Sequence, residues 1–221
     1  MSATQQTQTL TAQLAEQKAS TIKKLPQETV ELMLNKTAEL ENSGIAENAL
    51  KVGDIAPDFQ LPNPVGDSVS LSDLLKNGPV VLTFYRGGWC PYCNLELRAL
   101  QQQLPFFAKY NAQIVAVSPQ TPDNSLSVQE IQELEFAVLS DASNNVARNY
   151  GLVFTLDEKL KPIYKSFGID IEASNGDESY ELPIPATYVI DKEGVIRYAF
   201  INTDYTQRAE PAEVLAAVEQ L

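Results

Sequence analysis

Two cysteines three positions apart are the residues best suited to chemistry in this sequence. Cys90 and Cys93 enclose Pro91 and Tyr92, and the chain has no further cysteine. Because a thiolate is a nucleophile and two neighbouring thiols can form a disulfide, the spacing predicts a reversible redox dithiol. Histidine is absent, which excludes Cys–His and Ser–His catalysis. Two cysteines cannot close a tetrahedral zinc site except across a dimer, so we expect no metal.

The dithiol lies between an expected strand and an expected helix. Residues 80–85 form the β-branched and aromatic run of a buried strand, which Arg86-Gly87-Gly88 interrupts. After the cysteines, leucines repeat at helical spacing, at Leu97, Leu100 and Leu104. Pro91 suits the first helical position, which makes Cys90 the N-cap, where backbone N–H groups and the helix dipole lower a thiol pKa. Cys93 shares the apolar face of the leucines, so we expect an exposed, reactive Cys90 and a shielded Cys93.

Composition limits the partners and the compartment. The chain has 221 residues, 44% of them hydrophobic, and a net charge of −13, which argues against nucleic acid and anionic membranes as partners. No apolar run approaches the ~20 residues of a membrane span, and the N-terminus has no signal-peptide pattern. We therefore expect a cytoplasmic protein, and in that compartment a Cys-x-x-Cys pair is more often catalytic than structural.

The first 50 residues differ in composition from the rest. Two apolar stripes, separated by Pro26, predict a helical hairpin that ends near Gly44. We divide the chain into this N-terminal helical extension, residues 1–50, and a main domain, residues 51–221. The hairpin either braces the main domain or contacts a second subunit in a possible homodimer, and the sequence leaves both open.

The main domain alternates strands with helices, which predicts an α/β fold. Buried strands are expected over 80–85, 113–118 and 136–139, and such alternation implies a parallel sheet core. A late hairpin pairs 185–190 with 195–201, so the sheet is mixed and flanked by helices. We expect a helix over 156–167 and a loop over 172–181.

Four stretches in this order resemble one known family. They are Val52 to Phe59, Phe84 to Cys93, Leu139-Ser140-Asp141 with Tyr150-Gly151, and Thr187 to Asp191 with Gly194. The chain resembles peroxiredoxin-like proteins of the alkyl hydroperoxide reductase/thiol-specific antioxidant family, in the thioredoxin-fold superfamily. The resemblance covers roughly residues 50–221. It implies a thioredoxin-like fold and an antioxidant peroxidase that reduces hydrogen peroxide or organic hydroperoxides. Thioredoxin- or glutathione-type reductants would regenerate the dithiol, and no bound cofactor is needed.

The active-site stretch departs from the family pattern. Arg86 stands where the family has proline, Cys90 where it has threonine, and Cys93 where it has the peroxidatic cysteine. Alignment with the family pattern thus indicates Cys93 as the attacking thiol. Helix-cap chemistry and the Trp-Cys-x-x-Cys pattern of thioredoxins indicate Cys90 instead. We favour Cys90, because the apolar stripe buries Cys93.

A second departure lies before the late hairpin, where the family usually carries an arginine. Here the residues are Ile184 and Pro185, similar to the proline loop of thioredoxins, in which a cis proline faces the dithiol. Arg86 either supplies the missing cation or is a solvated turn residue. Trp89, Tyr85, Ile184 and Pro185 are expected to line the substrate site. Tyr205 and Arg208 are interpreted as structural, and Glu96 is placed on the polar side of its helix, so no proton acceptor is evident.

Three functions compete at this point. A thiol peroxidase is favoured. A thioredoxin-like protein disulfide oxidoreductase is the alternative that the Cys-x-x-Cys and the proline loop support. A non-enzymatic redox sensor or scaffold, in which the hairpin binds a partner in one redox state, is the third.

Overall fold

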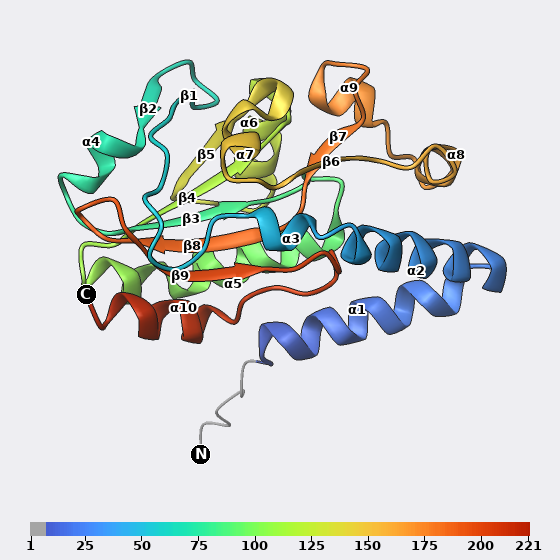
Figure 1. Cartoon of the computed structure of the whole chain (residues 1–221), viewed down its shortest axis with the longest axis horizontal. Helices are drawn as coiled ribbons and strands as arrows, with labels where there is room; N and C mark the ends of the chain where they lie inside the picture. Colours follow the sequence, from blue (N-terminus) through green and yellow to red (C-terminus); the bar gives the residue numbers. More distant parts are fainter. Residues whose placement is uncertain (1–7) are drawn as a thin grey trace.

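A five-stranded mixed sheet forms the centre of the computed structural model, which describes residues 8–221 (Figure 1). Its strands lie in the order β5-β4-β3-β8-β9. Strands β3, β4 and β5 run parallel, and β8 pairs antiparallel with both β3 and β9. The sheet consists of β3 (Val80–Phe84), β4 (Gln113–Ser118), β5 (Ala137–Ser140), β8 (Ala186–Ile190) and β9 (Ile196–Ile201). Two separate antiparallel pairs are β1 (Gln60–Pro62) with β2 (Ser68–Ser70) and β6 (Val153–Thr155) with β7 (Glu181–Pro183).

Helices cover both faces of this sheet (Figure 1). They are α1 (Leu10–Lys24), α2 (Gln27–Asn42), α3 (Ile45–Asn48), α4 (Leu71–Leu75), α5 (Pro91–Ala108), α6 (Pro122–Ile131), α7 (Asn145–Asn149), α8 (Lys161–Ser166), α9 (Ile171–Asn175) and α10 (Pro211–Val218), with a short 3₁₀ turn η1 (Ala142–Asn144). Across residues 8–221, none of these helices is long and apolar enough to cross a membrane. The mixed α/β architecture with flanking helices confirms the predicted fold class.

Strand β3 explains why the centre of the sheet is apolar on both sides. Successive side chains of a strand point to opposite faces. Val81 packs into the core beneath α5 and α10, while Leu82 and Phe84 pack into the core beneath α4 and α7. Every residue of β3 is buried. The polar exception, Thr83, points to the α5 face, where it meets the site described below.

The predicted N-terminal helices are present as α1 and α2. Leu10 and Leu14 of α1 are each 3% exposed and pack into the core beneath α5. Helix α2 has no buried residue, and its Lys36 forms an ion pair of 2.9 Å with Asp157. The hairpin therefore braces the main domain, which was one of the two alternatives that the sequence left open. Contact with a second subunit, and the division of the chain at residue 50, stay predictions.

The region between β5 and β8 differs from its predicted secondary structure. The helix expected over 156–167 is shorter, because Pro162 near the start of α8 has no N–H to extend a helix upstream. The loop expected over 172–181 contains all of α9 except its first residue, and also the first residue of β7. Asp170 caps α9 by accepting a 3.0 Å hydrogen bond from the Ala173 N–H, and Gly176 ends it at φ 73°. Such short capped turns leave almost no periodic signal in a sequence.

Candidate active site

The turn from β3 into α5 places the two cysteines as predicted. Pro91 is the first residue of α5, and Cys90 is its N-cap. Gly87 has φ 150° and packs against the Trp89 ring, so a side chain would not fit there. The Gly87 carbonyl accepts a 3.0 Å hydrogen bond from the Cys90 N–H. The turn therefore holds the Cys90 thiol at the positive end of the α5 dipole.

Cys90 is buried, which corrects the expectation that it is exposed. Only 1% of it is accessible, because residues from the N-terminal hairpin and from the segment around α8 pack over the start of α5. It nevertheless lines a cavity of about 80 Å³, here called the Cys90 cavity. The lining residues are Thr21, Met33, Arg86, Trp89, Cys90, Pro91, Tyr92, Tyr164, Phe167, Ile169 and Tyr205. Access to this thiol is thus through a cavity rather than from an open surface.

Cys93 is fully buried, as predicted, and is held by an arginine from the far end of the chain. Arg208 Nη2 donates a 3.1 Å hydrogen bond to Cys93 Sγ, and Arg208 Nε donates one of 2.6 Å to Glu96 Oε2. The arginine is fixed further by the carbonyls of Tyr205 and Gln207, each at 2.6 Å. This corrects the interpretation of Arg208 as purely structural. It lies 115 positions from Cys93, so no local pattern could have revealed it.

Glu96 is also in the site, which corrects its predicted place on a polar helix face. It is 2% exposed, and Thr187 Oγ1 donates a 3.0 Å hydrogen bond to its Oε1. Burial raises the pKa of this carboxyl to about 7, although the charge of Arg208 acts in the opposite direction. The sequence did hold a signal, since positions i and i+3 share a helix face and Cys93 already pointed inward.

The pKa values of the two thiols shift in opposite directions, although the thiols interact directly. Burial opposes ionisation of Cys90, but its hydrogen bond with Cys93 and the charge of Arg86 outweigh burial, and the pKa of Cys90 falls to about 6. For Cys93, burial and the neighbouring Cys90 raise the pKa well above its ordinary value. The surroundings therefore favour the thiolate at Cys90 and the protonated thiol at Cys93.

Arg86 is buried inside the site, which rules out the solvated turn residue. Only 2% of it is accessible, and its Nη2 donates a hydrogen bond to Tyr164 Oη. Aromatic rings surround its guanidinium carbon, with centroids at 4.9 Å for Trp89, 5.5 Å for Tyr164 and 4.4 Å for Tyr205. Tyr205 is thus part of the site as well, against expectation. Cation–π contacts of this kind hold a guanidinium in place without neutralising it.

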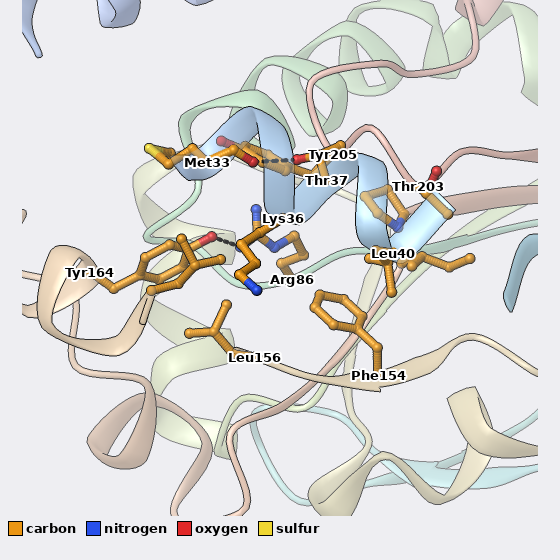
Figure 2. Close-up of a pocket in the computed structure, with 13 residues that line it drawn as sticks. Met33, Lys36, Thr37, Leu40, Arg86, Phe154, Leu156, Tyr164, Thr203 and Tyr205 are labelled. Carbon is orange, nitrogen blue, oxygen red and sulfur yellow. Dashed lines mark hydrogen bonds between the residues drawn. The ribbon is translucent and has the colours of Figure 1, made fainter. Parts of the chain in front are cut away.

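The remaining predicted site residues lie in three different places. Trp89 lines the Cys90 cavity, as expected. Tyr85 is fully buried and lines neither that cavity nor the one next to it. Ile184 and Pro185 line a neighbouring cavity, which Arg86 also lines (Figure 2). No peptide bond within residues 8–221 is cis, so the expected cis form of Pro185 is wrong; trans is the lower-energy form for most X–Pro bonds.

Comparison with known proteins identifies the fold and the family. The model of the AhpC/TSA family matches residues 52–199. The chain belongs to the AhpC/TSA family. Among relatives of this AhpC/TSA protein, the bcp peroxiredoxin homologue of Helicobacter pylori is 37% identical over 153 residues, which are 69% of this chain and 89% of that protein. The chloroplastic peroxiredoxin Q of Triticum aestivum is 27% identical over 180 residues, 81% of this chain and 72% of that protein.

Solved structures agree with this assignment. Peroxidoxin BcpB of Mycobacterium tuberculosis superimposes with a TM-score of 0.62 at 25% identity, covering 78% of this chain and 98% of that chain. The AhpC/TSA protein described here is thus a peroxiredoxin-like, thiol-dependent peroxidase of the bcp and peroxiredoxin Q type. The family match leaves out α1 and α2 and also Arg208, so both the helical brace and the arginine on Cys93 lie beyond it.

Proposed function

We propose that the protein reduces hydroperoxides through a Cys90–Cys93 dithiol/disulfide cycle in which Cys90 attacks first. The observation that carries this order is the contrast between the two thiols. Cys90 lines a cavity, and its pKa is lowered to about 6. Cys93 does not line that cavity, and its pKa is raised. Since the thiolate is the nucleophile, the accessible thiol of lower pKa is the better candidate.

The chemistry balances with the two thiols and one external reductant. The Cys90 thiolate attacks the terminal oxygen of the hydroperoxide, the O–O bond breaks, and the alkoxide or hydroxide leaves and takes up a proton. Cys90 is then a sulfenic acid. Cys93 attacks the Cys90 sulfur and displaces hydroxide, which takes up the Cys93 proton to form water. An external dithiol, or two monothiols, reduces the disulfide by exchange.

Each buried arginine supports one half of this cycle. Arg86 faces Cys90 and favours its thiolate before the attack. Arg208 donates to Cys93 Sγ, so it stabilises the negative charge that forms there when Cys93 loses its proton. Glu96 and the two carbonyls hold Arg208 in this orientation. We assign Arg208 and Glu96 to the site for this reason.

The reductant and the compartment follow from the chemistry. We infer a thioredoxin- or glutathione-type reductant in the cytoplasm, where free thiols persist in the reduced state. Hydrogen peroxide and organic hydroperoxides are both candidate substrates, because the cycle requires only an O–O bond that reaches Cys90. No cofactor takes part in any step of the proposed cycle.

Serine variants of the two cysteines test the order of the thiols. We expect Cys93→Ser to form a sulfenic acid at Cys90 in a single turnover with peroxide, which dimedone traps and peptide mass spectrometry locates. Cys90→Ser should form no trapped sulfenic acid and should consume no peroxide with dithiothreitol as the reductant. The reverse result, with the adduct at Cys93 in Cys90→Ser, would show that Cys93 attacks the peroxide, as the family pattern indicates. Cys90 would then be the thiol that forms the disulfide.

Burial of Cys90 also weighs against the disulfide oxidoreductase alternative. A partner protein's disulfide must reach the attacking sulfur, and Cys90 is 1% exposed in this structure. Insulin reduction by the reduced protein should therefore be slow relative to peroxide consumption. Fast insulin reduction without peroxide turnover would favour the alternative instead.

A further inference from the structure

Arg86 is a buried cation without a carboxylate partner. Among residues 8–221, no Asp or Glu lies within ion-pair distance of its guanidinium, and its Nε is buried without a hydrogen-bond partner. Arginine does not lose its proton in proteins, so burial cannot neutralise it. A buried charge without a counter-ion is unfavourable unless a ligand or a neighbouring anion compensates it.

The Cys90 thiolate compensates this charge only through space. No hydrogen bond joins Arg86 to Cys90, and the hydrogen bond that Arg86 does make goes to Tyr164. The thiolate is also consumed once Cys90 is oxidised, since a sulfenic acid and a disulfide are neutral at that sulfur. Among residues 8–221, the guanidinium therefore has no anion in direct contact while Cys90 is reduced, and it loses the nearby thiolate charge once Cys90 is oxidised.

A second cavity lies beside Arg86 (Figure 2). It has a volume of about 40 Å³ and is here called the Arg86 cavity. Its lining residues are Met33, Lys36, Thr37, Leu40, Arg86, Phe154, Leu156, Leu160, Tyr164, Ile184, Pro185, Thr203 and Tyr205. Apolar side chains dominate this wall, and it includes no carboxylate. Figure 2 shows Lys36 and Arg86 lying together among Tyr164, Leu156 and Phe154.

Of the two cations in this wall, Arg86 is the one that lacks a partner. Lys36 Nζ is already paired with Glu39 at 2.6 Å and with Asp157 at 2.9 Å. Its charge is thus neutralised by the protein, while the charge of Arg86 is not. The Arg86 cavity and the Cys90 cavity are neighbours, because Met33, Arg86, Tyr164 and Tyr205 line both.

We propose that the Arg86 cavity binds the carboxylate of a short, apolar hydroperoxide whose –OOH group lies in the Cys90 cavity. This assignment rests on the proposed peroxidase cycle and names its substrate class. Cavities of about 80 Å³ and 40 Å³ hold about ten non-hydrogen atoms, because each water-sized group needs roughly 10–15 Å³ of such space. The ligand is therefore short, with its anionic end in the Arg86 cavity and its reactive end in the Cys90 cavity.

The wall of this subsite comes partly from outside the shared family fold. Met33, Lys36, Thr37 and Leu40 all belong to α2, and the family match begins at residue 52. Helix α2 thus adds a selective wall to the catalytic centre from outside residues 52–199, the part that the family model matches. The N-terminal hairpin acts as a specificity element as well as a brace.

A matched substrate pair tests the proposal in the full-length protein. The probes are 4-hydroperoxy-4-methylpentanoate and its primary amide, which has the same number of non-hydrogen atoms but no negative charge. We expect the acid to have a kcat/KM about tenfold or more above that of the amide. Arg86→Gln should bring the ratio close to one, and Arg86→Lys should retain part of it. A change in thiol activation alters both substrates alike, so the ratio reports only the anion contact.

The exposed Arg98 supplies a matched control variant. It lies on α5, lines neither cavity and donates a hydrogen bond to Gln132. Arg98→Gln removes one positive charge, as Arg86→Gln does, and should keep the acid-to-amide ratio of kcat/KM that the unaltered protein shows. Equal kcat/KM values for acid and amide in the unaltered protein would overturn the proposal. Turnover of neither substrate, with no turnover of hydrogen peroxide, would instead overturn the peroxidase cycle.

Direct binding provides a readout that does not depend on turnover. The unreactive carboxylate 4,4-dimethylpentanoate should change the fluorescence of Trp89, the one tryptophan of the chain, in a saturable way. Its neutral amide should bind at least about tenfold more weakly, and Arg86→Gln should abolish the difference. Equal binding of carboxylate and amide to the unaltered protein would overturn the anion subsite.

Discussion

The two buried arginines of the site have opposite surroundings. Arg208 has a carboxylate at 2.6 Å, two carbonyls and a thiol, so each part of its guanidinium fork is occupied. Arg86 has one phenol and aromatic ring faces, and its Nε has no partner in the part of the chain that the structure describes. Both side chains are at most 5% exposed, so solvent compensates neither charge.

This difference separates a structural role from a binding role. A fully satisfied buried ion pair fixes one geometry, and breaking it leaves an uncompensated charge. An unsatisfied cation costs folding free energy, and an anion that reaches it recovers part of that cost. The Cys93 side of the site is therefore rigid and specified by the fold, while the Cys90 side is the side that takes up ligands.

Loss of Glu96 should have the largest effect on stability. Glu96→Leu leaves Arg208 charged and buried, so we expect the free energy of unfolding to fall by about 3–5 kcal/mol. Arg208→Leu should cost less at pH 6 than at pH 8, because Glu96, with a pKa of about 7, can take up a proton. Urea denaturation of the reduced protein measures both. Lys76→Leu, which breaks an exposed ion pair, is the control and should change little. Equal losses for Glu96→Leu and Lys76→Leu would contradict the comparison.

The ionisation of Cys90 and the ionisation of Glu96 should change the free energy of unfolding with pH in opposite directions. The pKa of Cys90 is lowered from 9.0 to about 6, so its ionisation contributes stability above pH 9 that is lost as pH falls to 6. The pKa of Glu96 is raised from 4.5 to about 7, so its ionisation costs stability as pH rises from 4.5 to 7. Each group contributes a slope of at most ~1.4 kcal/mol per pH unit.

Two variants isolate these slopes in urea denaturation of the reduced protein across pH 4.5 to 9. Cys90→Ser should reduce the rise in stability between pH 6 and pH 9. Glu96→Gln should reduce the fall between pH 4.5 and pH 7. If the unaltered protein and both variants give parallel profiles, the two groups do not titrate as assigned.

Arg86→Leu should affect reactivity more than stability. Removing an unpaired buried cation relieves its desolvation cost, so we expect the free energy of unfolding to stay unchanged or to rise. The Cys90 thiolate loses one of its stabilising charges, and a pKa increase of about two units would slow alkylation by iodoacetamide about tenfold at pH 7. Alkylation rates across a pH series measure the shift. A large loss of stability with an unchanged alkylation profile would reverse the roles of the two arginines.

A hydroxyl next to Glu96 should have the smallest effect. Thr187→Val removes a 3.0 Å hydrogen bond to Glu96 Oε1, and we expect a loss of about 1–2 kcal/mol. Thr83→Val removes a longer contact of 3.4 Å to the same oxygen and should cost less. Urea denaturation at pH 8, where Glu96 is ionised, separates the two. A larger loss of stability for Thr83→Val would show that the hydroxyl on β3 stabilises Glu96 more than the hydroxyl on β8 does.

The sequence contains enough information for the sheet and for the position of the dithiol. Local signals define these features: the apolar run of β3, the glycine turn, and proline at the first position of α5. The late hairpin is likewise local, because β8 and β9 are separated by one short turn. Short-range patterns of this kind survive in a single sequence because neighbouring residues decide them.

The residues that complete the site depend on long-range packing. Arg208 reaches Cys93 across 115 positions, and Tyr164 reaches Arg86 across 78. No periodicity in one sequence reports such contacts. The burial of Cys90 was missed for the same reason, since its cover comes from α2 and from the segment around α8. Glu96 could have been found, because its helical phase matches that of Cys93.

Because Cys90 is enclosed, the two half-reactions of the proposed cycle differ in the size of the reactant that must reach it. Oxidation needs a small peroxide, whereas regeneration needs a reductant. A peroxide of a few atoms fits the 80 Å³ beside the sulfur. A folded redoxin must align its own sulfur with the Cys90–Cys93 bond, but Cys90 is 1% exposed and lies in a cavity that Thr21 and Met33 help to line. We therefore expect oxidation to proceed in the closed arrangement, and regeneration by a folded redoxin to require that these walls move. Turnover at saturating peroxide would then follow the rate of that movement and slow in viscous solvent.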